Sequence, residues 1–222
     1  MTETLTLDAL RQKIDEIDNE LLTKLAERQN LSRAIVKQKV LGSDVFRPDR
    51  EASLLRNLQA GHPHIGAKLI FALWRQIISA SIAEQKPDYL ILHTDETAAL
   101  SHGHAAGFLK EKQVPRAEEA LSMVADGQAD CAIITQADLD SLESHLGSSS
   151  QLYIVAKLPF ASAESASITG YIIARSLPGP SGDDVVVYRD KAGQVCHQQG
   201  YPNAEFLQDA SIIGIYATPL SF

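Results

Sequence analysis

Cysteine and long apolar runs are scarce in this sequence. Only Cys131 and Cys196 occur among 222 residues, which is too few for a disulfide framework and lacks the spacing of a zinc site. No run of eighteen apolar residues is present, and no charged and then apolar leader precedes a small-residue cleavage site. We therefore expect a soluble protein of the reducing cytoplasm, without a membrane span or a bound metal.

Tracts of basic residues are also missing. Residues 1–86 hold 13 Lys and Arg against 11 Asp and Glu, whereas residues 87–222 hold 7 against 17. An acidic second half argues against nucleic acid as a partner, and the cations of the first half stand at separate positions. A small anion is therefore the expected ligand.

Glycine and proline are absent from residues 7–40, and apolar residues recur there every three or four positions. This spacing predicts one long amphipathic helix, Leu7 to Val40. The apolar positions are Leu7, Leu10, Ile14, Ile17, Leu21, Leu25, Leu31 and Ile35. A helix of this length needs a partner helix along its stripe, either from this chain or from a second copy.

Two further helices are expected before Pro87, one from Pro48 to about Ala60 and one from about Ile65 to Gln85. Beyond Pro87 the pattern changes to short apolar runs, which predict strands, and helical stretches at 117–125 and 139–146. The predicted strands are 89–92, 131–134, 152–155, 171–174, 185–188 and 212–216. We therefore predict a multi-domain chain, with an all-α three-helix domain at 1–88 and a small α/β domain at 89–222.

Three cations of the long helix are candidate ligands of an anion. Arg28 and Lys39 differ by roughly 20° around the helix and about 16 Å along it, so their side chains can converge. Arg11 lies roughly 26 Å from Arg28 on the same helix. Antiparallel pairing of two such helices would bring Arg11 of one chain toward Arg28 and Lys39 of the other. Taken singly, each of these residues is more simply explained as a solvated surface cation.

Four segments, read in order, make this pattern specific: LDALRQKIDEIDNELLTKLAER, VKQK, PDREASLL and WRQIISASIAEQ. They resemble the chorismate mutase domain of the all-helical class, as found fused to prephenate dehydratase in a bacterial bifunctional enzyme. The resemblance implies an intertwined helical homodimer. It also implies rearrangement of the dicarboxylate chorismate to prephenate, in phenylalanine and tyrosine biosynthesis. That reaction needs no cofactor, metal or nucleophile, because orientation and fixed charges supply the rate.

The resemblance also assigns roles to seven residues. Arg28 and Arg11 of the partner subunit would hold the two carboxylates, since Arg is a rigid bidentate donor. Lys39 and Gln85 would donate to the breaking ether oxygen. The remaining contacts would come from Glu51, which accepts from the substrate hydroxyl, from Ser81 at a carboxylate, and from Arg50 in support. One departure is Arg47, which stands where the family often has an acidic residue.

The second half resembles prephenate dehydratase in two stretches, AEEALSMVADGQADCAIITQADLDSL and SITGYIIAR. In the first, ITQA replaces the family's Pro-Ile-Glu-Asn segment. In the second, Thr169, Gly170 and Tyr171 occupy the places of Thr-Arg-Phe. Dehydration with decarboxylation needs a cation and an acid, and Gly170 supplies neither. We expect a degenerate domain without its own chemistry, which serves structural support or small-molecule regulation.

Other interpretations remain open at this point. The chain could be a bifunctional mutase and dehydratase whose active residues have moved, or a related helical lyase that releases pyruvate from isochorismate. It could also be a sensor that binds an aromatic-pathway metabolite without converting it. His102 and His104, with His93, give a weak metal pattern that lacks Cys or carboxylate partners.

Overall fold

The structure is a computed structural model that describes residues 6–38, 44–162, 168–203, 206 and 211–221. Its backbone contacts divide the chain into two compact units, residues 1–43 and residues 44–222. The predicted domain boundary near residue 88 is a different division and stays a prediction. The three helices and the α/β region that follows them confirm the predicted fold class.

The first unit contains α1 (Leu7–Gln38), an unbroken helix of 32 residues. Thr6 caps it, since its hydroxyl accepts from the backbone N–H of Ala9 at 3.3 Å. The predicted helix end at Lys39 and Val40 lies outside the described residues. Much of the predicted apolar stripe is 45–67% exposed: Leu7, Leu10, Ile14, Ile17, Leu21, Leu31 and Ile35, together with Leu22. Such a surface is typical of a helix that pairs with another helix.

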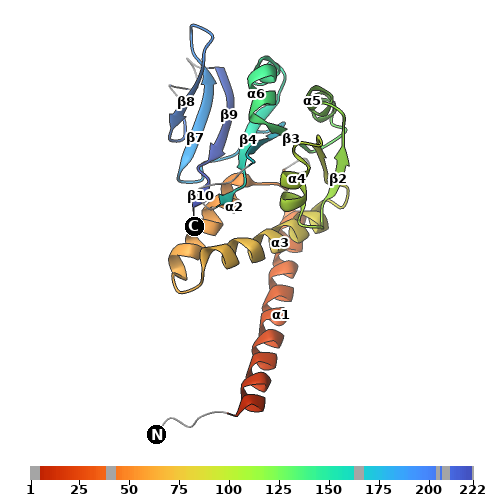
Figure 1. The fold of residues 1–222 in the computed structure, drawn as a ribbon, viewed down its shortest axis with the longest axis vertical. Helices are drawn as coiled ribbons and strands as arrows, with labels where there is room; N and C mark the ends of the chain where they lie inside the picture. The colour runs from red at the N-terminus through yellow and green to blue at the C-terminus, as the bar shows by residue number, and fades with distance from the viewer. Residues whose placement is uncertain (1–5, 39–43, 163–167, 204–205, 207–210, 222) are drawn as a thin grey trace. The chain divides into compact units, whose positions relative to one another are not determined.

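The second unit is built on a mixed eight-stranded sheet with the order β2-β1-β3-β6-β4-β9-β7-β8. All six predicted strands are confirmed: β1 (Leu90–His93), β3 (Cys131–Thr135), β4 (Tyr153–Leu158), β6 (Gly170–Ala174), β7 (Asp184–Arg189) and β9 (Ser211–Ala217). β1 pairs in parallel with both β2 (Lys110–Gln113) and β3, and β6 is antiparallel to β3 and β4. Figure 1 shows β2 and β8 (Val195–Gln199) at opposite edges of the sheet.

Both faces of the central strands of this sheet are buried, and alternate residues of a strand point to opposite faces. Leu92, Ile134 and Ile173 pack on one face with α5 (Ala117–Ala125) and α6 (Gln136–Leu142). Their chain neighbours, such as Ile133 and Ile172, pack on the other face. There they meet α3 (Ala67–Gln85) and α4 (Ala98–Ala105), so the second unit has three layers.

The second and third helices therefore pack against the α/β region within one unit. α3 places Ile78 and Ile82 in the same apolar cluster as Ile133 of the sheet. α2 (Pro48–Gly61) is joined to the C-terminal strands through Arg56, whose guanidinium donates to the carbonyl oxygens of Ser181, Asp183 and Thr218. These contacts span more than a hundred residues of sequence, and helical periodicity alone does not reveal them.

Five elements, four strands and one helix, were not predicted from the sequence. The edge strands β2 and β8 read KEKQ and VCHQQ, and edge strands tolerate polar residues because one side of each faces solvent. The two-residue strands β5 (Ala161–Ser162) and β10 (Leu220–Ser221) pair with each other. The short helix α4 is also new. α6 begins at Gln136, three residues before the predicted start at residue 139, because Thr135 and Asp138 form a capping box. A 3₁₀ turn, η1 (Glu143–His145), follows α6.

Close packing at Gly170 yields a stability prediction. A β-carbon there would lie 2.7 Å from the carbonyl oxygen of Ile134 and 2.8 Å from Cδ1 of Leu100. That oxygen belongs to the neighbouring strand β3, so it cannot move without disturbing the sheet. We expect Gly170→Ala to lower the free energy of unfolding by about 1–3 kcal/mol in urea denaturation.

The matched control is Gly103→Ala in α4, where a β-carbon would meet no atom within 4 Å. This change should leave stability unaltered or raise it by up to about 1 kcal/mol, because Ala favours helix more than Gly does. A Gly170→Ala variant as stable as its parent would contradict the packing at β6.

Candidate functional site

Two of the predicted site residues lie on α1. Arg11 is exposed and forms an ion pair with Asp8 at 3.4 Å, one turn earlier on the helix. An exposed pair of this kind is weak, so Arg11 can exchange Asp8 for another anion at little cost. Arg28 is half-buried on the same helix. Lys39 lies outside the described residues.

Arg50 and Glu51 lie in the first turn of α2 and differ in burial. Arg50 is exposed, whereas Glu51 is buried. Arg47, which departs from the family pattern, is the N-cap residue and binds Asp49 with two hydrogen bonds of 3.1 and 2.7 Å. Arg47 is therefore engaged within its own helix start, and the Asp49 carboxylate is buried beneath it.

Arg75 of α3 binds Glu51 of α2 and also lies beside α4. Its Nη1 donates to Oε2 of Glu51 at 2.8 Å, and its Nε donates to the hydroxyl of Ser79 at 3.1 Å. Nη1 also lies 3.5 Å from Nδ1 of His104 on α4. Burial raises the pKa of the Glu51 carboxyl, and the charge and hydrogen bond of Arg75 oppose that rise. Sequence reasoning missed Arg75, although a single cation inside the apolar run LIFALWRQII is a usable signal.

Ser81 and Gln85 lie near the end of α3, four residues apart and therefore on one face, as predicted. The Ser81 hydroxyl is buried and donates to the carbonyl oxygen of Ile77 at 2.8 Å. Gln85 is half-buried at the last position of the helix. The α3 residue bound to Glu51 is Arg75, roughly 9 Å before Ser81 along the axis. The gathering of all seven residues into one site stays a prediction.

His104 is buried between two aromatic rings and beside Arg75. The ring of Phe46 lies edge-on at 5.1 Å, and that of Phe160 is stacked at 6.0 Å. Burial, followed by repulsion from Arg75, lowers the pKa of His104 well below its ordinary value. The imidazole is therefore neutral near pH 7. Because a guanidinium can only donate, Nδ1 is the acceptor nitrogen and Nε2 carries the proton.

Two of the three histidines of the weak metal pattern are neighbours, since the rings of His93 and His102 lie edge to face at 5.7 Å. Nδ1 of His93 lies 2.9 Å from the carbonyl oxygen of Thr94, and Nδ1 of His102 lies 2.9 Å from Glu111. Within the described ranges, no three His, Cys, Asp or Glu side chains gather closely enough to hold a metal ion. In the same part of the chain, no helix has the length and apolar character needed to cross a membrane.

The lowered pKa of His104 predicts a pH effect on stability. The unfolded chain binds a proton at His104 as the pH falls below about 6.5, and the folded chain does not. The free energy of unfolding is therefore highest above that pH and decreases as the pH falls further. We expect the free energy of unfolding to drop by up to about 1.4 kcal/mol per pH unit below 6.5. His104→Gln should remove this part of the slope.

The measurement is urea denaturation between pH 5 and 7.5 at fixed protein concentration. His145→Gln, at an exposed histidine, is the matched control and should keep the parental slope. Equal slopes in the parent and His104→Gln would show that His104 is not held neutral.

Comparison with known proteins bears on the helical part of the chain. A family model described as chorismate mutase type II matches residues 10–86. No curated protein matches the chain significantly. Two solved structures that match are "GqqA- a novel type of quorum quenching acylases", at 14% identity and a TM-score of 0.39, and a prephenate dehydratase from Streptococcus mutans, at 10% and 0.40. Each alignment covers 58% of this chain, with 95% and 98% of the other chain respectively.

Likenesses at these TM-scores carry no argument about this chain's chemistry. The family match is different, because it spans nearly all of α1 together with α2 and α3. The region that matches the chorismate mutase type II model is therefore the three-helix part of the chain, residues 10–86.

Proposed function

We propose that this protein is a chorismate mutase, which rearranges chorismate to prephenate in aromatic amino acid biosynthesis. The observation that carries the proposal is the family match at residues 10–86. That range includes every residue to which the sequence assigns a role: Arg11, Arg28, Lys39, Arg50, Glu51, Ser81 and Gln85. The reaction is pericyclic, so the protein must hold a compact substrate conformer and stabilise charge on the ether oxygen.

The family resemblance assigns the role of each residue, and the chemistry of each side chain suits its role. Arg28 and Arg11 of the partner subunit hold the two carboxylates, and Lys39 and Gln85 donate to the ether oxygen. Glu51 accepts from the substrate hydroxyl. The ion pair with Arg75 supports this role, because it fixes the orientation of a buried carboxylate. Ser81 contacts a carboxylate and Arg50 supports the site, with no cofactor.

The proposed enzyme is a homodimer in which two α1 helices pair antiparallel. Support comes from the exposed stripe of α1, where eight large apolar side chains are at least 45% exposed. Covering them with a second copy would contribute on the order of ten kcal/mol, comparable with the cost of association. Antiparallel pairing also overcomes the roughly 26 Å that separates Arg11 from Arg28 within one chain.

We propose that residues 89–222 support the helical domain structurally and catalyse no reaction. Gly170 replaces the Arg of the resembling dehydratases, and a β-carbon there would collide with β3. Thr135, in the ITQA segment, is used to cap α6. The sheet meanwhile buries one side of α3. Both cysteines of the chain are free, which fits the proposed location in a reducing cytoplasm.

The direct test is to incubate the purified protein with chorismate and identify the product before and after mild acid, which converts prephenate to phenylpyruvate. We expect prephenate alone before acid. Phenylpyruvate before acid would contradict the non-catalytic assignment of the second half. Unchanged chorismate would contradict mutase activity, and release of pyruvate from isochorismate would then favour the lyase.

Two arginine variants sharpen this assay. Arg28→Ala should lower kcat/KM by about 100-fold or more, because it removes a donor to a substrate carboxylate. Arg33→Ala removes an exposed cation of the same helix to which no role is assigned, and it should remain within about threefold of the parent. Equal losses in the two variants would argue against a site at Arg28.

A further inference from the structure

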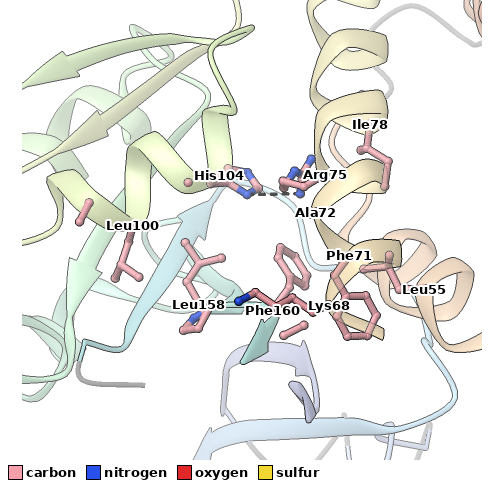
Figure 2. Close-up of a pocket in the computed structure, with 14 residues that line it drawn as sticks. Leu55, Lys68, Phe71, Ala72, Arg75, Ile78, Leu100, His104, Leu158 and Phe160 are labelled. Atoms are coloured by element: carbon pink, nitrogen blue, oxygen red, sulfur yellow. Dashed lines mark hydrogen bonds between the residues drawn. The ribbon is translucent and has the colours of Figure 1, made fainter. Parts of the chain in front are cut away.

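A cavity of about 330 Å³ lies inside the second unit, between α3, α4 and the segment that follows β4. Leu55, Phe71, Leu100, Leu158 and Phe160 form most of its wall. Figure 2 shows Arg75 and His104 facing each other at one end of this cavity, with Phe160 and Phe71 beside it. The volume is at the lower end of the range of about 300–1,000 Å³ for small-molecule sites.

Arg75 and His104, at one end of the cavity, each carry a buried hydrogen-bond donor. Nη2 of Arg75 and Nε2 of His104 are both buried and have no hydrogen-bond partner among the described residues. Arg75 can only donate, and Nε2 carries the imidazole proton because Nδ1 faces Arg75. A buried donor without an acceptor costs about 1–3 kcal/mol. Two such donors at one end of a cavity call for a ligand that brings acceptor oxygens.

The charge of the cavity favours an anion. Lys68 also lines it and lies seven residues before Arg75, so both cations stand on the same face of α3. The described lining contains these two cations and no carboxylate. The walls beyond them are aliphatic and aromatic, and the ring of Phe160 is already stacked with His104. This arrangement suits a carboxylate at one end of a flat apolar body.

We infer that this cavity binds a small aromatic carboxylate, whose oxygens accept from Arg75 and His104 and whose ring lies among Phe71, Leu100 and Phe160. Nothing assigned to the mutase site occupies this position, since Arg75 touches Glu51 with Nη1 and the cavity ligand would take Nη2. The ligand would also regulate the enzyme, a consequence that rests on the proposed mutase function.

The regulatory effect follows from the shared guanidinium. A carboxylate at Nη2 brings a second negative charge close to Glu51, whose own carboxylate is buried and already raised in pKa. Two neighbouring negative charges repel each other, which favours protonation of Glu51. Glu51 would then accept less well from the substrate hydroxyl, so the ligand should lower mutase activity.

The test uses 3-phenylpropionate as the probe in isothermal titration calorimetry on the full-length protein. Phenethylamine, with the same ring and a positive charge, is the matched control ligand. We expect one 3-phenylpropionate bound per chain and no measurable binding of phenethylamine. Equal affinity for both compounds, or no binding of 3-phenylpropionate at millimolar concentration, would overturn the site.

Gly103→Leu locates the binding, because Gly103 lines the cavity and a β-carbon there meets no atom within 4 Å. The added side chain should weaken 3-phenylpropionate at least tenfold. Gly61→Leu makes the same change at an exposed glycine outside the cavity, where space is also open, and should bind like the parent. If Gly103→Leu fails to fold, Ala72→Leu fills the same cavity from α3. Unaltered affinity in a folded filled variant would refute the location.

Regulation is tested separately from binding. Saturating 3-phenylpropionate should lower kcat/KM for chorismate at least threefold in the parent and in Gly61→Leu, and by less in Gly103→Leu. Binding without any change in turnover would refute the coupling through Arg75 and leave the site standing. A protein that binds the probe but never converts chorismate would refute the proposed function and not the cavity.

Discussion

The burial of α3 against the sheet is the constraint on which the second unit depends. One side of this helix places Ile78 and Ile82 in the apolar cluster of the sheet. The same helix carries Arg75, which holds the buried carboxylate of Glu51. Because both sets of contacts come from one rigid element, any displacement of α3 on the sheet would also move Glu51. The proposed chemistry and the α/β region are therefore mechanically connected.

This connection gives a physical reason for the second half of the chain. In the proposed dimer, a second copy of α1 covers the exposed apolar stripe of the first. α3 also packs apolar side chains against the sheet. The guanidinium of Arg56 on α2 donates to carbonyl oxygens of residues that flank the C-terminal strands. Loss of residues 89–222 would uncover Ile78 and leave the Arg56 donors without these acceptors. The C-terminal region thus supports α2 and α3.

Much of the fold could be predicted because periodicity is a local property. The 3.6-residue pattern predicted α1, and buried strands such as β3 appear as short apolar runs. β2 could not be found in this way, because an exposed edge strand carries no apolar pattern. The packing of α3 on the sheet was also beyond reach, since an apolar helix face does not reveal its partner. Within the site, the family resemblance assigned Glu51, whereas its partner Arg75 emerged only from the three-dimensional contacts.

In the proposed dimer, each active site takes residues from two chains. The most direct measurement mixes Arg11→Ala with Lys39→Ala, two variants that should each be nearly inactive, and lets their subunits exchange before the chorismate assay. If the site is shared, each mixed dimer holds one site with both cations intact, and random exchange should restore about a quarter of the parental activity. Activity no higher than that of either variant alone would contradict a shared site and the antiparallel pairing of α1.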